Sequence, residues 1–385
     1  MKIMLSAGEV SGDLHGRRLA EALLSIDPSV QLFGFGGREM EEAGVRLVKD
    51  FADYNVMGVW EVLKNLRRIM KLLHDLETSM REERPDLLVL IDYPDFNWRL
   101  AKKAKAMGIP VFSYIPPSAW AWRKGRAKAC AAVADEFVAI FPHELPPYEK
   151  AGAKISFVGN PLVDTVRPEI PLTRAPEEFG LGEGEIPILL LPGSRRQEIE
   201  MLLPSMLGAA KILKEKRPET RFYLPVADEA LEARIRELIG EAGIEVALTH
   251  KNRYALMGMG AAAMAASGTV VMEAALMGLP CVVLYRLSWL SAFIGRLLVH
   301  VDNISLPNIL LGERFQTELL QEEVTPEKAA EATLQLYPGE KHRFQVCAKL
   351  KEACRKLGEP GAAYRVAEKV LSCARRHKEL FINKF

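Results

Sequence analysis

Short apolar runs alternate with helical patterns along almost the whole chain, and this alternation constrains the fold more than any other feature. Strands are predicted at residues 3–6, 31–35, 87–91, 111–115, 136–140 and 155–158, and then at 188–191, 221–226, 245–249, 260–265 and 281–285. Amphipathic segments separate the strands within each series. Because strands that alternate with helices form parallel sheets covered by helices, the sequence predicts an α/β protein with two parallel sheets.

A candidate linker separates the two series of strands. Residues 164–187 are rich in Pro, Gly, Asp and Glu and lack a sustained apolar period. A chain of 385 residues is long enough for two hydrophobic cores. We therefore expect a boundary near Arg167, with one domain over residues 1–167 and a second over 168–339. Beyond about Thr325 the pattern is helical and charged, and we expect helices within residues 340–385 to complete the first domain.

Composition argues against several classes of protein. The formal net charge of +1 disfavours nucleic acid as the main partner, because phosphate binding usually requires a basic domain. The five cysteines include no C-x-x-C pair, so a disulfide framework and a zinc site are not expected, and a reducing cytoplasm fits. Glu9 and Asp13 interrupt the N-terminus before an apolar export signal can form. The uncharged stretch 255–272, about 18 residues long, contains Gly, Ser and Thr, which favours a buried strand and turn over a membrane span.

The centre of the chain contains a candidate phosphate-binding turn. An apolar run over residues 188–191 stops at Pro192 and Gly193, and Ser194 then offers an N-cap for a helix. Backbone N–H groups at a helix N-terminus attract anions, and the Arg195 guanidinium can bind a diphosphate. Gly193, Ser194 and Arg195 are therefore predicted to bind the diphosphate of a nucleotide.

A second turn of this kind follows the predicted strand 260–265. Ser267, Gly268 and Thr269 can hold phosphate oxygens, and Glu273 lies one helical turn later, where a carboxylate can accept both hydroxyls of a ribose. The alternative is an ordinary capped helix start. We favour the nucleotide site because this turn is expected beside Arg195, at a neighbouring strand end.

The first predicted strand ends in a glycine turn over residues 6–13. Ser11 and Gly12 lead into a helix, and glycine there lets a ligand approach the backbone. The acidic Glu9 and Asp13 would repel a diphosphate, so sugar hydroxyls are the better partners. A tight turn with an N-cap explains the pattern equally well.

Asp92 follows the apolar strand 87–91, where ligands of parallel sheets bind. Its carboxylate is a candidate general base, whereas Asp95 is expected to cap the next helix. Neither acid has a histidine or a third carboxylate within local ligand spacing, so no metal site is predicted here.

A loop rich in aromatic residues follows the predicted strand 111–115. Ser118, Trp120, Trp122 and Arg123 lie on it, and the paired rings can stack on a sugar or on acyl chains while Arg123 meets a phosphate. The alternative is that both rings fill the core. Two tryptophans separated by one residue are difficult to bury on one helical face, which favours a functional loop.

Two segments suggest an apolar partner. The segment 59–73 combines apolar and basic residues, as an interfacial helix does, and the segment 288–299 has a similar composition. The candidate membrane contacts in the first segment are Trp60, Leu63, Leu66, Arg67, Arg68, Ile69 and Lys71. For either segment taken alone, ordinary packing against a core is the favoured interpretation, because most amphipathic helices face a core.

Taken together and in this order, the motifs resemble those of the lipid-A-disaccharide synthase family. The matching strings lie at residues 7–13, 91–97, 117–123, 191–195, 267–269 and 305–308. The Trp-Ala-Trp-Arg and Ser-Leu-Pro-Asn strings are specific to that family, and the resemblance covers nearly the whole chain. Asn160 departs from the pattern, since the family often has His there, and no titrating role is expected for it.

The resemblance implies an inverting glycosyltransferase of the GT-B class, with two Rossmann-like domains around a cleft. The family transfers 2,3-diacylglucosamine from its UDP carrier to the 6-hydroxyl of 2,3-diacylglucosamine 1-phosphate (lipid X), which gives a β-1,6 disaccharide. We expect Asp92 to remove the acceptor proton and Arg195 to stabilise departing UDP. The resemblance also implies Glu9 and Asn308 as active-site groups and Glu273 as the ribose ligand.

The resemblance further implies where the protein acts and with what. It implies peripheral attachment to the inner face of the cytoplasmic membrane, no metal or other cofactor, and in some members a homodimer formed by exchange of C-terminal segments. Two alternatives stay open. A UDP-sugar epimerase shares the architecture but needs no acyl-binding surface, and a non-catalytic membrane-surface protein would not explain the two glycine turns.

Overall fold

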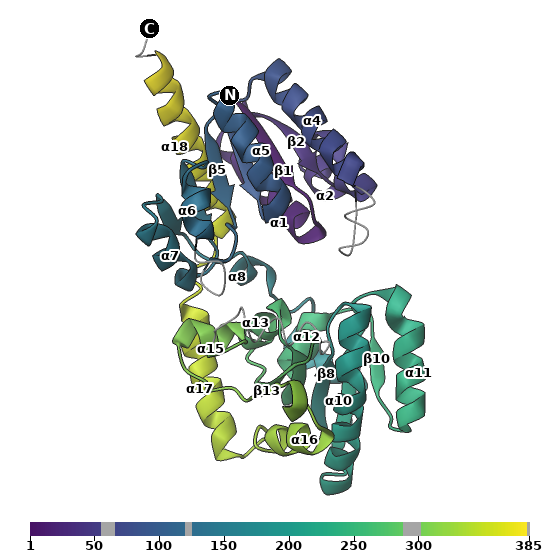
Figure 1. The fold of residues 1–385 in the computed structure, drawn as a ribbon. Helices are drawn as coiled ribbons and strands as arrows, with labels where there is room; N and C mark the ends of the chain where they lie inside the picture. The colour runs from purple at the N-terminus through teal and green to yellow at the C-terminus, as the bar shows by residue number, and fades with distance from the viewer. Residues whose placement is uncertain (55–65, 120–124, 288–301, 383–385) are drawn as a thin grey trace. The chain divides into compact units, whose positions relative to one another are not determined.

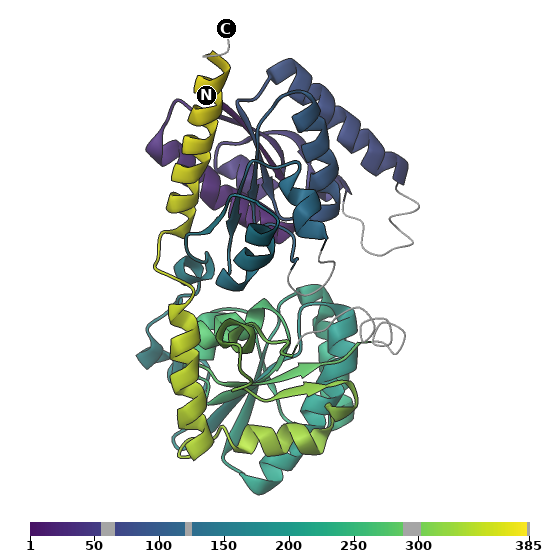
Figure 2. The same ribbon diagram turned by 60° about the vertical axis from the view of Figure 1, so that its left-hand side comes forward.

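The computed structural model describes residues 1–54, 66–119, 125–287 and 302–382. The chain forms two compact units, shown in Figure 1 and Figure 2. Unit 1 consists of Met1–Pro161 and Glu359–Phe385, and unit 2 consists of Leu162–Gly358. The predicted α/β class with two parallel sheets is confirmed.

Unit 1 is built on a parallel sheet of seven strands in the order β3-β2-β1-β4-β5-β6-β7. Its strands are β1 (Lys2–Ala7), β2 (Gln31–Gly36), β3 (Arg46–Asp50), β4 (Leu87–Ile91), β5 (Val111–Tyr114), β6 (Glu136–Ala139) and β7 (Ile155–Phe157). Every residue of the central strand β4 is buried, which is typical of a parallel sheet covered on both faces.

Helices cover both faces of the first sheet. The helices of unit 1 are α1 (Val10–Ile26), α2 (Arg38–Glu42), α4 (Leu66–Glu83), α5 (Pro94–Ala106), α6 (Arg126–Ala131), α7 (Leu145–Lys150) and α18 (Ala362–Ile382). Because side chains alternate along a strand, Ile3 and Leu5 of β1 pack in a core with α1 and α18. Met4 packs on the opposite face with α4 and α5. Figure 2 shows α18 running along the unit as its last helix.

Unit 2 is built on a parallel sheet of six strands in the order β10-β9-β8-β11-β12-β13. Its strands are β8 (Ile186–Leu191), β9 (Thr220–Pro225), β10 (Ala247–Thr249), β11 (Ala262–Ala266), β12 (Cys281–Tyr285) and β13 (Glu318–Leu320). Its helices are α8 (Leu162–Thr165), α9 (Ala175–Glu178), α10 (Arg196–Lys216), α11 (Glu232–Ala242), α12 (Arg253–Met259), α13 (Thr269–Leu276), α15 (Leu306–Leu311), α16 (Pro326–Leu334) and α17 (Lys341–Arg355). Residues of α12 and α13 share a core with β8 and β11, and α10 packs against α16.

The central strands lie close to their predicted positions. The strands predicted at 87–91 and 281–285 coincide with β4 and β12. The stretch 255–272 forms most of α12, all of β11 and the start of α13, so the prediction of a buried strand and turn there is confirmed. The sequence did not indicate β3 and β13, which are the outermost strands of their sheets. An outermost strand pairs on one side only, and β3 is exposed or half-buried throughout, so its apolar signal is weak.

The chain returns to unit 1 only for its last helix. Helix α17 packs against α13 and α15 in unit 2, whereas α18 packs against α1 in unit 1. The units divide after Pro161 and again after Gly358, compared with the expected positions near Arg167 and residue 340.

Arg365 of α18 joins the two places where the chain passes between the units. Its Nε donates to the carbonyl oxygen of Val158 at 2.6 Å, and its Nη atoms donate to those of Pro360 at 2.7 Å and Glu359 at 2.5 Å. All three carbonyl groups belong to unit 1. The segments before Leu162 and after Gly358 are therefore held together within unit 1.

Candidate functional site

Each sheet has one point at which the order of its strands reverses. This point lies between β1 and β4 in unit 1 and between β8 and β11 in unit 2. Ligands of open parallel sheets bind beyond the carboxyl ends of the strands at such points. Glu9 and Asp92 follow β1 and β4, and Arg195 and Ser267 follow β8 and β11. Each unit therefore places its predicted site residues at its own reversal point, and the expected proximity of the Arg195 and Ser267 turns is confirmed.

Unit 2 has a cavity of about 650 Å³ at its reversal point. Its walls include every residue that the sequence assigned to the nucleotide, namely Gly193, Ser194, Arg195, Ser267, Gly268, Thr269 and Glu273. This volume is within the range of small-molecule sites. The two turns thus contribute to one cavity.

The first turn leads from β8 into α10. Gly193 has a φ of 106°, and a Cβ atom there would lie 2.2 Å from Oε2 of Glu198, so the position requires glycine. The N-cap of α10 is Arg195, and the expectation that Ser194 is the N-cap was wrong. The reason is that the Glu198 side chain caps the helix instead. The Arg195 side chain is 79% exposed, so it is accessible to an anion.

Glu198 occupies the backbone N–H groups that the sequence assigned to a phosphate. Its Oε2 accepts hydrogen bonds from the N–H of Ser194 at 3.2 Å and of Arg195 at 3.3 Å. Its Oε1 lies 3.9 Å from the Arg195 guanidinium. A diphosphate that uses these two amides therefore has to replace the Glu198 carboxylate.

The second turn leaves space above its backbone. The Ser267 hydroxyl donates to the carbonyl oxygen of Ile304 at 3.1 Å, which fixes the start of the turn. A Cβ atom on Gly268 would have nothing within 4 Å, so the cavity is open to a ligand at this position. Thr269 begins α13 and lines the same wall.

Glu273 lies on α13 and is fixed by the start of α12. Its Oε1 accepts a hydrogen bond from the Tyr254 hydroxyl at 3.1 Å and lies 3.2 Å from the Arg253 guanidinium. Tyr254 itself is held because its backbone N–H donates to Glu169 at 3.1 Å. The sequence pattern did not identify Glu169, Arg253 or Tyr254. Their position after β10 could have identified them, because loops at the carboxyl ends of parallel strands line ligand sites.

Charged residues of both signs line the cavity. Arg195, Lys251 and Arg253 line it, and all three are exposed. The lining also includes three carboxylates that are engaged in hydrogen bonds within the protein, namely Glu169, Glu198 and Glu273. The exposed cationic side chains are therefore the candidates to pair with a diphosphate.

Asp92 is the central acid of the candidate site in unit 1. It follows β4 with a φ of 49°, a left-handed conformation that is uncommon for Asp and that occurs often at functional sites. The Asn97 side chain holds this turn, because its Nδ2 donates to the carbonyl oxygen of Asp92 at 2.7 Å and its Oδ1 accepts from the Ser6 hydroxyl at 2.7 Å. Burial, with a smaller effect from the charge of Glu9, raises the pKa of Asp92 to about 6.

The residues around the β1 turn differ in exposure. Glu9 and Ser11 are exposed, so both are accessible to a ligand. Gly12 is buried in the first turn of α1. The charge of Glu9 contributes to the raised pKa of Asp92, after the larger effect of burial.

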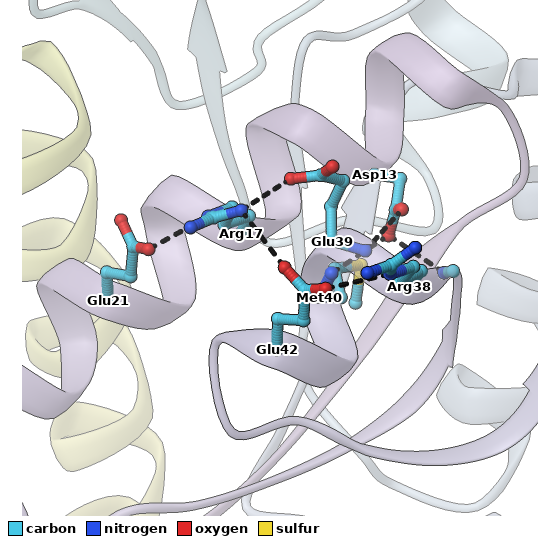
Figure 3. Close-up of polar contacts among 8 residues, drawn as sticks. Asp13, Arg17, Glu21, Arg38, Glu39, Met40 and Glu42 are labelled. Carbon is cyan, nitrogen blue, oxygen red and sulfur yellow. Dashed lines mark hydrogen bonds and ion pairs between the residues drawn. The ribbon is translucent and has the colours of Figure 1, made fainter.

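Asp13 does not face a ligand, and the expectation that it meets sugar hydroxyls was wrong. Its side chain is only 3% exposed, and its oxygens accept hydrogen bonds from the N–H groups of Gly37 at 2.8 Å, Glu39 at 3.0 Å and Met40 at 3.2 Å. Figure 3 shows the carboxylate directed at the start of α2. Arg17 reinforces the same junction through Glu39 at 2.7 Å. Asp13 therefore caps α2.

Asp95 also has a different position from the one expected. Helix α5 begins at Pro94 with Tyr93 as N-cap, so Asp95 lies inside the first turn and does not cap the helix. Its side chain is 90% exposed and lies 3.3 Å from the Arg126 guanidinium. It remains accessible to a ligand.

Glu144 is an acid near Asp92 that the sequence pattern did not single out. Its Oε2 accepts hydrogen bonds from the N–H groups of Ile140 at 3.1 Å and Phe141 at 3.0 Å, after the end of β6. Burial raises the pKa of Glu144 to about 7, and the charge of Asp92 adds to this effect. An isolated glutamate in a segment without glycine gave no motif by which to find it.

Asn308 is buried in unit 2, where it organises the loop before β13. Its Nδ2 donates to the carbonyl oxygen of Gln316 at 3.0 Å and to Oε1 of Glu318 at 2.8 Å. Its Oδ1 accepts from the N–H groups of Phe315 at 3.2 Å and Gln316 at 3.0 Å. The side chain is 0% exposed, and it is not among the described residues that line the cavity.

Several predicted contacts fall outside the described residues. Trp120, Trp122 and Arg123 lie there, as do Trp60 and Leu63 and the whole segment 288–299. Ser118 is described and exposed. At the start of α4, which begins at Leu66, the side chains of Arg67, Arg68 and Lys71 are exposed and that of Ile69 is half-buried. Among the described helices, none has the length and apolar character to cross a membrane.

Comparison with known sequences identifies the family. A family model described as lipid-A-disaccharide synthetase matches residues 3–370. The chain belongs to this family. Named lipid-A-disaccharide synthases from Geobacter metallireducens and Syntrophus aciditrophicus are 42% and 41% identical over 370 and 375 residues. The alignments cover 96% of both chains in the first case, and 97% of this chain and 98% of the relative in the second.

Solved structures with a similar fold agree with two Rossmann-like units in a member of this synthetase family. A putative UDP-N-acetylglucosamine 2-epimerase from Listeria monocytogenes has a TM-score of 0.67 at 16% identity and covers 96% of each chain. MurG from Acinetobacter baumannii has a TM-score of 0.60 at 14% identity, covering 96% of this chain and 99% of its own. Identities this low show the fold alone. The epimerase alternative is therefore not favoured, because the relatives at about 40% identity are named lipid-A-disaccharide synthases.

Proposed function

We propose that this chain transfers 2,3-diacylglucosamine from UDP to the 6-hydroxyl of 2,3-diacylglucosamine 1-phosphate. The products are UDP and a tetraacyl β-1,6 disaccharide 1-phosphate. Membership of the lipid-A-disaccharide synthetase family over residues 3–370 is the observation that carries this proposal. The nucleotide-sized cavity in unit 2 and the perturbed acid in unit 1 support it.

The reaction needs a base for the acceptor and stabilisation for the leaving group. In the proposed step, Asp92 takes the proton from the 6-hydroxyl while the hydroxyl oxygen forms a bond to the anomeric carbon of the donor. The bond from that carbon to the diphosphate breaks, and its electron pair leaves with UDP. Attack on the opposite face inverts the anomeric centre. Arg195 and the amides at the start of α10 stabilise the charge on departing UDP.

The remaining parts of the proposal rest on the family resemblance. We propose that Glu9 and Asn308 assist the reaction, that Ser11, Asp95 and the loop with Ser118 contact the acceptor, and that no metal takes part. We also propose peripheral attachment to the inner face of the cytoplasmic membrane and a homodimer. Chelation with EDTA should leave the rate unchanged, vesicle flotation tests attachment, and light scattering tests the dimer.

The activity can be tested directly with defined substrates. Purified protein is incubated with the UDP-linked donor and with 2,3-diacylglucosamine 1-phosphate, and mass spectrometry measures UDP and the disaccharide. We expect UDP release only when the acceptor is present. An Arg195→Ala variant should react more slowly, and folding should be preserved because this side chain is 79% exposed. No disaccharide from folded protein would reject the transferase, and formation of an isomeric UDP-sugar without acceptor would favour the epimerase.

A further inference from the structure

Glu273 makes its polar contacts through one of its two oxygens. The Tyr254 hydroxyl donates to Oε1 at 3.1 Å, and an Arg253 Nη atom lies 3.2 Å from the same oxygen. The same Arg253 atom donates to the Tyr254 hydroxyl at 2.6 Å, so that the hydroxyl proton is directed to the carboxylate. Within the described part of the chain, both contacts of Glu273 fall on Oε1. Oε2 therefore remains for a ligand in the cavity that Glu273 lines.

Tyr254 is itself held firmly at the start of α12. Its backbone N–H and that of Ala255 each donate to Oε2 of Glu169 at 3.1 Å. Asn252, the N-cap residue of α12, has a φ of 56° and donates from its side chain to Glu178 at 3.0 Å. The Tyr254 side chain is largely buried, with 8% of the residue exposed. Its hydroxyl is thus a fixed reference point for the Glu273 carboxylate.

We propose that Tyr254 is a positioning residue that orients Glu273 towards the hydroxyls of a ribose, so that the cavity selects ribonucleotides over 2′-deoxyribonucleotides. This inference rests on the proposed UDP-linked donor. A carboxylate that loses one ribose hydroxyl is left without a hydrogen bond, which lowers affinity. The loss is large only if the carboxylate is held in place, because a mobile carboxylate can turn towards the hydroxyl that remains.

Calorimetric titration of the full-length protein with UDP and with 2′-deoxy-UDP tests this role. We expect the wild type to bind UDP about 10-fold more tightly or better, as for loss of a hydrogen bond to a charged group. In Tyr254→Phe the ring is kept and only the hydroxyl is lost, so the ratio of the two dissociation constants should fall by about 3-fold or more. Arg253→Met, which changes an exposed side chain, should lower the ratio too.

Tyr337→Phe is the matched control. The Tyr337 hydroxyl is also buried in unit 2 and is hydrogen-bonded to Thr220 Oγ1 at 2.7 Å, but Tyr337 is not among the described residues that line the cavity. This control should leave the ratio at the wild-type value. If Tyr254→Phe and Arg253→Met weaken UDP and 2′-deoxy-UDP equally, or not at all, the positioning role is rejected while the nucleotide site stands. If the wild type binds neither nucleotide, the proposed donor itself fails.

Discussion

Asp92 is held in an environment that opposes its charged form. Its backbone is left-handed, its carboxyl group is largely removed from water, and Glu9 adds a second negative charge nearby. These features raise the pKa of Asp92 to about 6, so the acid is mostly ionised and still basic near neutral pH. The position thus favours proton transfer at the expense of stability.

The substitution Asp92→Asn should separate these two effects. We expect kcat to fall by about 10²-fold to 10⁴-fold, as for loss of a general base. We also expect the free energy of unfolding at pH 8 to rise by on the order of 1 to 2 kcal/mol, because ionising a carboxyl group whose pKa is raised by folding disfavours the folded state.

The stability gain of Asp92→Asn should depend on pH. The penalty is fully present above the folded-state pKa of about 6 and is lost as the pH falls towards the unfolded value. Chemical unfolding of both proteins at pH 8 and pH 5 measures it. A stability gain that does not shrink at pH 5, or an active variant, would contradict the assignment.

Glu9→Gln should change the pH dependence of the reaction. Asp92 must be ionised to accept a proton, so kcat/KM should rise with pH through about 6. Removal of the Glu9 charge lowers the pKa of Asp92, so the rise of kcat/KM should move to lower pH. It should not move as far as the ordinary pKa of an aspartate, because burial is the larger cause of the raised pKa. Profiles of kcat/KM against pH measure the position of this rise independently of the maximal rate. Glu82→Gln, an exposed position in α4, is the control and should leave the rise in place.

At the scale of elements, the sequence predicted the strands and turns better than it predicted which side chains contact those turns. The central strands are continuous apolar runs, and Gly193 and Gly268 mark turns that line the cavity. In contrast, Asp13 caps α2 and Glu198 caps α10 through contacts that depend on folded geometry. A carboxylate near a glycine turn has the same local pattern whether it binds a ligand or a helix N-terminus. The residues that support Glu273 were missed for the same reason.

Helix α18 supplies core to a unit whose other elements lie far away in the sequence. Val366, Val370 and Leu371 are buried in the same core as Ile3 and Leu5. Leu371→Ala should lower the free energy of unfolding of unit 1 by about 2 to 5 kcal/mol, because it leaves a cavity in a packed core.

Tyr364→Ser in the same helix is the control. Tyr364 is 49% exposed, so the change should be within about 0.5 kcal/mol. Thermal unfolding is measured with and without UDP. Because UDP is expected to stabilise unit 2 only, the transition that UDP does not shift is assigned to unit 1. An equal effect of the two substitutions would show that α18 does not complete this core.

At the scale of the whole molecule, the two units divide the proposed reaction. Of the described residues, those that line the cavity all belong to unit 2, whereas Asp92 and Glu9 belong to unit 1. Arg365 confines both connecting segments to one place within unit 1. The interdomain boundaries are therefore natural points at which to separate nucleotide binding from transfer.

A fragment spanning residues 162–358 should bind UDP but not transfer sugar. It contains all the described residues that line the cavity and lacks the proposed base. We expect UDP to raise its melting temperature, and Arg195→Ala in the same fragment should reduce that increase. Transfer by the fragment alone would contradict the role of Asp92. A folded fragment without affinity for UDP would contradict a self-contained nucleotide site.

The Glu198 carboxylate at the start of α10 has a consequence for which anions can compete with a nucleotide. It is tethered to the site, so its effective concentration there exceeds that of a free ion. Inorganic phosphate offers only the charge that Glu198 already provides and should be excluded at ordinary concentrations. A ligand that adds contacts from a base, a ribose and a second phosphate can displace the carboxylate. When that ligand dissociates, the Glu198 carboxylate binds the two amides again and competes with any new anion. Glu198 would therefore exclude small anions from the site.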